Sequence, residues 1–163
     1  MEVIPVELVE KTWEEVSAFS PDRANKEMMK LSKRQPNLLE FIMGITQDMN
    51  QDVQELAIYM FFVVCRIFEK GSTKKIKKIS LKEIIKCHES NIEFMESLEG
   101  THEKILERIA SIQLSDQPYI MMYVVTTLME TPDEDDPVDL TEEDIGYLFL
   151  ILKTVMDLLD RAA

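Results

Sequence analysis

Apolar side chains recur along most of this chain at steps of three and four residues, the spacing that places them on one face of an α-helix. The segment after Pro5 shows this pattern, with a predicted stripe made of Val6, Val9, Trp13 and Val16. No stretch alternates between apolar and polar residues as a half-buried strand does. We therefore predict an all-α protein of about eight helices with almost no strand.

Residues that favour helix ends divide the chain into these helices. Ser80-x-x-Glu83 and Thr141-x-x-Asp144 fit the capping box, in which two side chains satisfy the first free amides of a helix. Gly71 is expected to end a helix in the left-handed conformation. The predicted helices begin near Pro5, Pro21, Pro36, Asn50 or Asp52, Ser80, Thr101, Pro118 and Thr141.

Two segments are apolar on every side, and such helices must be surrounded by others. They cover residues 56–64 and, apart from Gly146, residues 145–152. Each large side chain buried there contributes about 1.5–3 kcal/mol. We expect the rest of a single domain, residues 1–163, to wrap around this pair. A helical-repeat-like stack and an orthogonal bundle with two buried hairpins both fit the pattern.

An internal repeat is one interpretation of a shared dipeptide. Gln35-Pro36 and Gln117-Pro118 each open a short apolar helix that leads into a long apolar helix. This organisation suggests two pseudo-repeats, over about residues 5–71 and 80–161. The alternative is that two unrelated hairpins each have proline at the first helical position.

The first of these hairpins resembles a known family. Its pattern consists of Pro36-x-Leu38-Leu39, Asp48, Asp52-Val53 and Ala57. Residues 35–70 thereby resemble the helical hairpin of HEAT-type repeat proteins, although Gln54 stands where that family has a basic residue. The resemblance implies a scaffold or adaptor that binds proteins along stacked helices.

The charge is strongly acidic overall, with a net charge of −13 and an isoelectric point of about 4.6. Such a chain repels nucleic acid and anionic membranes as a whole. Within the basic run from Lys70 to Lys86, the candidate partner-binding residues are Lys74, Lys75, Lys77 and Lys78. This run is interpreted as a solvated connector, as a docking surface for an acidic partner, or as a contact for nucleic acid.

Residues 133–144 form an acidic run, opposite in charge to the basic run. Placed on a calcium-binding EF-hand loop that starts at Asp133, it has Val138 where the turn-forming glycine is needed. A solvated linker that caps the last helix is the better interpretation.

Few other residues suggest chemistry. His88 lies on a predicted seam formed by Leu81, Ile85, His88, Ile92 and Met95, and is expected to be a packed histidine with one hydrogen bond. Met28 and Met29, on a mostly polar helix, are candidates for an adaptable contact surface. Cys65 and Cys87 have no metal-binding spacing and are interpreted as reduced thiols. No signal-type segment begins the chain and no apolar run has the roughly 20 residues of a membrane span, so we expect a cytoplasmic protein.

These observations favour a non-catalytic α-helical interaction or adaptor module that binds another protein and needs no cofactor. The reason is that the buried segments show no inward polar groups on which chemistry could be built. A helical enzyme, or a binder of a small apolar ligand between helices, is the alternative. A polar cavity lined by His88 and carboxylates would favour that alternative. The sequence leaves the partner, and self-association into a homo-oligomer, open.

Overall fold

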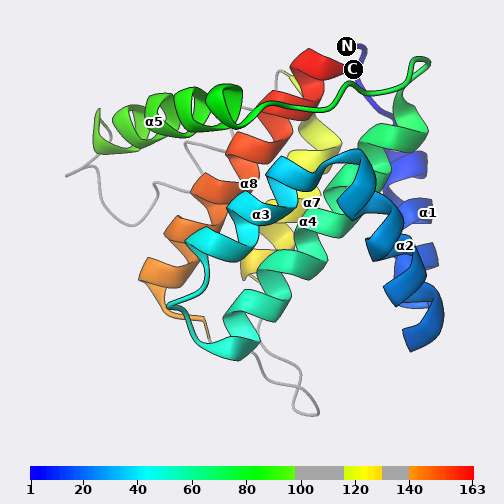
Figure 1. Cartoon of the computed structure of the whole chain (residues 1–163), viewed down its shortest axis with the longest axis horizontal. Coiled ribbons are helices and arrows are strands. Elements are labelled where there is room, and N and C mark those ends of the chain that lie inside the picture. Colours follow the sequence, from blue (N-terminus) through cyan, green and yellow to red (C-terminus); the bar gives the residue numbers. More distant parts are fainter. Residues whose placement is uncertain (98–115, 130–139) are drawn as a thin grey trace.

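The computed structural model describes residues 1–97, 116–129 and 140–163. Every regular element in these ranges is a helix, which confirms the all-α prediction. The helices, labelled as in Figure 1, are α1 (Val6–Ser17), α2 (Pro21–Arg34), α3 (Pro36–Ile45), α4 (Gln51–Gly71), α5 (Leu81–Ser97), α7 (Pro118–Met129) and α8 (Glu142–Ala162). The helix predicted from Thr101 and the acidic run from Asp133 to Asp139 lie outside the described residues.

The predicted capping boxes are both present. At the start of α5, the Ser80 Oγ accepts a hydrogen bond from the Glu83 N–H at 3.2 Å, and a Glu83 carboxylate oxygen accepts one from the Ser80 N–H at 2.9 Å. At the start of α8, Thr141 and Asp144 make the same reciprocal pair. These two helices therefore begin where the sequence places them.

Gly71 has a different role from the one predicted. It is the last residue of α4, and its backbone is not left-handed. A Cβ atom at this position would lie 2.7 Å from Cδ1 and Cγ1 of the buried Ile4 side chain. Glycine is therefore needed because the segment before α1 crosses the end of α4 at close range.

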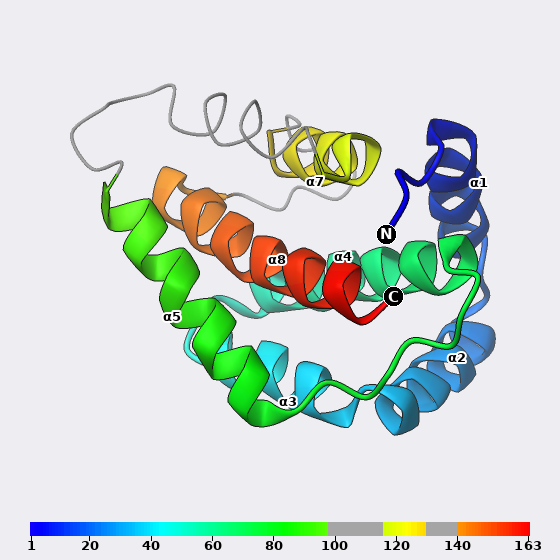
Figure 2. The ribbon, with the colours of Figure 1, turned by 90° about the horizontal axis from the view of Figure 1, so that it is seen from above.

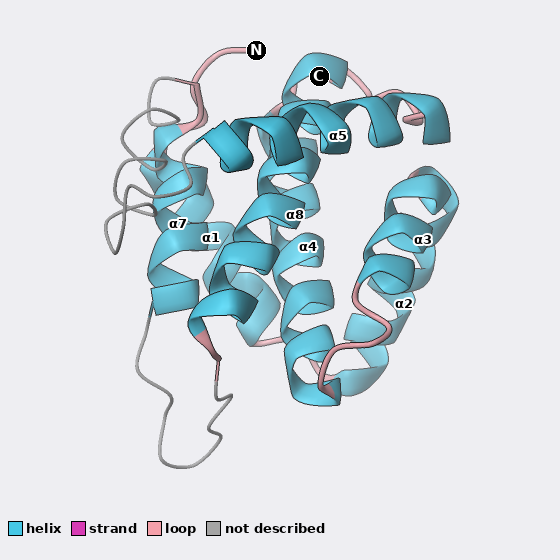
Figure 3. Cartoon of the chain, turned by 90° about the vertical axis from the view of Figure 1, so that its left-hand side faces the viewer, coloured by secondary structure: helices cyan, strands magenta, loops and turns pink. Residues whose placement is uncertain are grey.

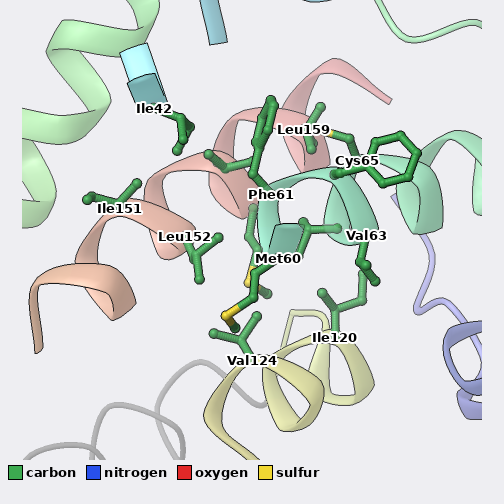
Figure 4. Close-up of a cluster of buried hydrophobic side chains, with 14 of the residues drawn as sticks. Ile42, Met60, Phe61, Val63, Cys65, Ile120, Val124, Ile151, Leu152 and Leu159 are labelled. Atoms are coloured by element: carbon green, nitrogen blue, oxygen red, sulfur yellow. The ribbon is translucent and has the colours of Figure 1, made fainter. Parts of the chain in front are cut away.

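The two all-apolar segments form the centre of the molecule, as predicted. Helices α4 and α8 lie side by side and run in the same direction (Figures 1 and 2). In α4 every residue from Met60 to Cys65 is buried, and in α8 every residue from Leu148 to Met156. Figure 4 shows labelled side chains of α3, α4, α7 and α8 converging in this core. Its burial is the main stabilising contribution to the fold.

The remaining helices close around this pair. Helices α1 and α3 pack against α4, and α5 packs against α8. Helix α7 packs against both α4 and α8 (Figure 3). Contacts also join α1 to α7 and α3 to α5, which are far apart in the sequence. In a solenoid each repeat contacts only its neighbours, so the described helices form a closed bundle. The HEAT-type resemblance of residues 35–70 concerns one hairpin and stays a prediction.

A buried glutamine ties α3 to the segment before α5. The Gln35 Nε2 donates a hydrogen bond to the Lys77 carbonyl oxygen at 2.8 Å, and the Gln35 Oε1 accepts one from the Ile79 N–H at 3.1 Å. The Asn37 Nδ2 adds a hydrogen bond to the Ile79 carbonyl oxygen at 2.9 Å. These side chains satisfy backbone groups of residues 77 and 79, which belong to no helix or sheet.

A second buried glutamine repeats this arrangement at α7. The Gln117 Nε2 donates to the Glu2 carbonyl oxygen at 3.0 Å, and the Gln117 Oε1 accepts from the Ile4 N–H at 3.0 Å. In both cases the side-chain amide binds a backbone carbonyl and a backbone N–H that are two residues apart. The groups bound by Gln35 lie just before α5, and those bound by Gln117 lie just before α1. We call Gln35 and Gln117 the glutamine clamps.

An ion-pair cluster attaches α1 and α2 to α4. The Glu15 carboxylate bonds Lys70 and also Arg66, the latter at 2.7 Å, and Arg66 reaches Glu27 of α2 at 3.3 Å. The hydrogen bonds from Lys70 and Arg66 lower the pKa of Glu15 from 4.5 to about 2. Burial alone would raise the pKa of Glu27, but Lys30 and Arg66 outweigh it and lower that pKa.

Candidate functional site

An open groove with a largely apolar lining lies between α1 and α7. Its volume is about 290 Å³, and it is lined by Val6, Val9, Glu10, Trp13, Tyr119, Met122, Tyr123, Thr126 and Thr127. Gln117, the residue just before α7, hydrogen-bonds the backbone of the segment just before α1. These bonds position the two walls of the groove. We call this surface the α1–α7 groove.

The orientation of α1 corrects the predicted stripe. Val9, Thr12 and Val16 are the buried residues of α1, and Trp13 is 43% exposed. The buried Thr12 hydroxyl donates to the Leu8 carbonyl oxygen at 2.7 Å, so this polar side chain is compatible with the core. Trp13 is therefore turned onto the groove and away from the core.

Large apolar side chains stand exposed along the groove. Tyr119 is 37% exposed and Met122 54% exposed, and α7 carries no charged residue at all. The α1 side of the groove carries the acidic Glu10, and Glu7 and Glu14 are also exposed on α1. The groove thus combines aromatic and thioether surface with an acidic border.

The basic run lies where it was expected, on the exposed connector between α4 and α5. Lys74, Lys75, Lys77 and Lys78 are all exposed, and none forms an ion pair with a described residue. Lys77 and Lys78 border a second cavity, which Lys74 and Lys75 do not line. A role of these lysines in partner binding stays a prediction.

The two candidate methionines of α2 are placed differently from each other. Met28 is half-buried and packs against the core, whereas Met29 is 62% exposed. Neither residue lines the α1–α7 groove. Of this pair, Met29 is the one whose side chain is largely exposed, and a role in partner binding stays a prediction.

His88 is half-buried in α5, edge-on to the Phe41 ring of α3, with 5.1 Å between ring centroids. The packing agrees with the prediction, but the buried Nδ1 atom makes no hydrogen bond to a described residue. Burial lowers the pKa of His88. His88 lines neither the groove nor the cavity beside Lys77, so the arrangement that would favour an enzyme is not found there.

The seam predicted for α5 is wrong in register. Leu81 and Ile85 are exposed, and the buried side chains of α5 are Ile84, Cys87 and Asn91. The reason is that a buried polar network, absent from the predicted seam, lies between α5 and α8. The apolar spacing of α5 marked the wrong face.

That network also corrects the expectation that no polar group points inward. Lys153 of α8 is buried and donates hydrogen bonds to the Asn91 Oδ1 and to an Asp157 carboxylate oxygen, both at 2.8 Å. The Asn91 Nδ2 donates to the Thr154 hydroxyl at 3.0 Å. Each of these polar groups has a partner inside the network, which makes it a connection between two helices. A lysine four residues before an aspartate in an apolar helix was the available sequence signal.

The two thiols are free and neither is activated. Burial is the first cause that raises the pKa of both Cys65 and Cys87, and a nearby carboxylate adds to it in each case. A protonated thiol is a poor nucleophile. Among the described residues, no group of histidine, cysteine, aspartate and glutamate side chains could hold a metal ion. None of the described helices is long and apolar enough to cross a membrane.

Comparison with known proteins gives no assignment. No protein-family model matches the chain, and no curated protein or solved structure matches it either.

Proposed function

We propose that this protein is a non-catalytic helical adaptor whose α1–α7 groove binds an amphipathic helix of another protein. The observation that carries the proposal is the row of exposed Trp13, Tyr119 and Met122 along one open groove. Aromatic residues and methionine are enriched at protein interfaces, and a helix laid in an apolar groove is a common mode of recognition.

The lining of the groove supports binding over catalysis. Of the described residues that line it, Glu10 alone is charged, and no histidine, cysteine or lysine is among them. The volume of about 290 Å³ lies just below the range of small-molecule pockets, which span roughly 300–1,000 Å³. An open and shallow apolar surface is better suited to the side chains of a partner helix than to an enclosed ligand.

The acidic rim indicates the charge of that helix. Glu10 lines the groove, and the exposed Glu7 and Glu14 lie three residues before it and four residues after it on α1. A partner helix with lysines or arginines beside its apolar face would place cations against these carboxylates. Complementary charge of this kind speeds association and excludes acidic competitors.

The chain's single tryptophan reports on this groove directly, because Trp13 lies in its wall. The probe is a synthetic 20-residue amphipathic helix with leucines on one face and lysines at its borders. We expect the peptide to shift Trp13 emission to shorter wavelength as the indole loses contact with water. A peptide with glutamate in place of each lysine should bind at least about 10-fold more weakly.

Two methionine variants provide the matched comparison. Met122→Glu places a carboxylate in the groove and should weaken binding of the lysine peptide at least about 10-fold. Met29→Glu changes an equally exposed methionine on α2 and should leave the affinity unchanged. No emission shift with the lysine peptide, or a loss confined to Met29→Glu, would refute the proposal.

A further inference from the structure

A second cavity, separate from the α1–α7 groove, gathers positive charge in this acidic protein. It has a volume of about 620 Å³ and lies between the connector that precedes α5, the first half of α5 and the last turns of α8. Four cationic side chains from these three segments line it: Lys77, Lys78, Lys86 and Arg161. We call it the basic cavity.

These cations are not neutralised by the described part of the chain. None of the four forms an ion pair there. The carboxylate that lines the cavity, Glu83, already accepts hydrogen bonds from the Ser80 N–H and hydroxyl at 2.9 and 3.0 Å. The nearby acids of α8 are also engaged, Asp157 with Lys153 and Asp160 with Gln117.

The connector that carries two of these lysines is held in place. The Gln35 clamp and Asn37 bind the backbone of residues 77 and 79 through three hydrogen bonds of 2.8–3.1 Å, and Ile79 is buried beneath. The Lys77 and Lys78 backbone is therefore fixed before any ligand arrives. Fixing a binding segment in advance lowers the entropic cost of binding.

The size and lining of the cavity define its ligand. A volume of about 620 Å³ falls within the roughly 300–1,000 Å³ of small-molecule sites. Lysines bind phosphate as point charges and arginine binds it with two parallel hydrogen bonds. Among the described residues that line the cavity, no aromatic side chain offers a surface on which a nucleic-acid base could stack. A chain of net charge −13 also repels long polyanions.

We propose that the basic cavity binds a small molecule that carries two or more phosphate groups. The cations of the connector, α5 and α8 surround the phosphates, and the Ser90 hydroxyl in the same wall offers a neutral hydrogen bond. This site is independent of the adaptor groove, since no residue lines both. It also gives the basic run a specific role at Lys77 and Lys78.

Calorimetric titration of the full chain with inorganic pyrophosphate at low salt tests the site. We expect saturable binding that weakens as potassium chloride is added. Replacing Lys77, Lys78 and Lys86 with methionine should weaken pyrophosphate binding at least 10-fold. The matched control replaces Lys11, Lys26 and Lys33 with methionine, three exposed lysines of α1 and α2 without ion pairs to described residues.

The control variant removes the same charge and should bind within twofold of the unchanged protein. Circular dichroism should show that both variants remain folded, because the replaced side chains are exposed. Citrate, a carboxylate polyanion of comparable charge, should bind at least 10-fold more weakly than pyrophosphate. The proposal is overturned if pyrophosphate does not bind at millimolar concentration, if the control loses as much affinity, or if citrate binds equally well.

Discussion

Glu15 shows how one side chain can contribute to the attachment of a whole helix. Its carboxylate lies between Arg66 and Lys70 of α4, and their hydrogen bonds lower its pKa from 4.5 to about 2. A carboxylate with a lowered pKa in the folded state stabilises the protein above the pKa that it has when unfolded. That stabilisation is lost as the pH falls through the folded pKa.

Glu15→Gln should therefore destabilise the protein at neutral pH by about 1–2 kcal/mol, a value reduced by the partial exposure of the cluster. The difference from the unchanged protein should shrink as the pH falls from 4.5 towards 2, where the native carboxylate becomes protonated. Urea unfolding of both proteins at pH 7 and at pH 2.5 measures this. An equal difference at the two pH values would show that the Glu15 charge is not the cause.

The N-terminal caps of α5 and α8 were predictable from the sequence, while residues on helix faces were less so. Ser80 and Thr141 cap their helices as expected, because a cap depends on neighbours three residues away. Trp13 could not be placed, since its exposure depends on how α1 sits against α4 and α7. The His88 Nδ1, which has no hydrogen-bond partner among the described residues, likewise depends on the packing of Phe41 from another helix.

At the scale of helices, α5 shows why apolar spacing can mark the wrong face. Exposed Leu81 and Ile85 offered a regular stripe, yet α5 turns Cys87 and Asn91 towards α8. It does so because the buried Lys153 needs the Asn91 carbonyl oxygen and the Asp157 carboxylate as partners. A polar residue whose partner lies on another helix leaves no periodic pattern.

Lys153→Met should destabilise the protein by about 2–4 kcal/mol, because it leaves Asp157 and Asn91 without their cationic partner. The double variant Lys153→Met with Asp157→Leu should recover part of this loss, since it removes the remaining charge as well. Lys86→Met, an exposed lysine of α5, serves as the control and should cost less than about 0.5 kcal/mol. Chemical unfolding gives all three values, and a Lys153→Met variant as stable as the control would contradict the role of the network.

For the molecule as a whole, the sequence predicted the helices and the central pair but not how the outer helices pair. Segments 56–64 and 145–152 were apolar on all sides, and this is a local property. Where α1 meets α7 and α3 meets α5, Gln117 and Gln35 hydrogen-bond backbone groups of the segment that precedes the other helix. Any residue supplies backbone groups, so the sequence does not reveal which segment a glutamine holds.

The glutamine clamps support the duplication that the Gln-Pro dipeptides suggested. Helices α1 and α5 are each held at their entry by the glutamine of the other half, and the contacts of α1 with α4 and α7 match those of α5 with α8 and α3. A protein of two pseudo-repeats, about residues 5–71 and 80–161, would show this reciprocal pattern. The duplication itself stays a prediction.

If the halves are equivalent, Gln35→Leu and Gln117→Leu should cost similar amounts. We expect about 2–4 kcal/mol for each, since both changes leave a buried backbone N–H and a carbonyl without partners. Gln47→Leu, at an exposed position of the α3–α4 turn, should cost less than about 0.5 kcal/mol. Thermal unfolding of the three variants tests this, and a large cost at only one clamp would argue against equivalence.

The Gln117 clamp also determines when the chain can finish folding as it is synthesised. Ile4 is synthesised 113 residues before Gln117, whose side chain binds its backbone N–H. At roughly 5–20 residues per second, this delay is about 6–23 s. During that interval the Ile4 amide has no clamp, and α7 is not there for α1 to pack against. The segment before α1 is therefore fixed in place only after the residues that begin α7 have been made.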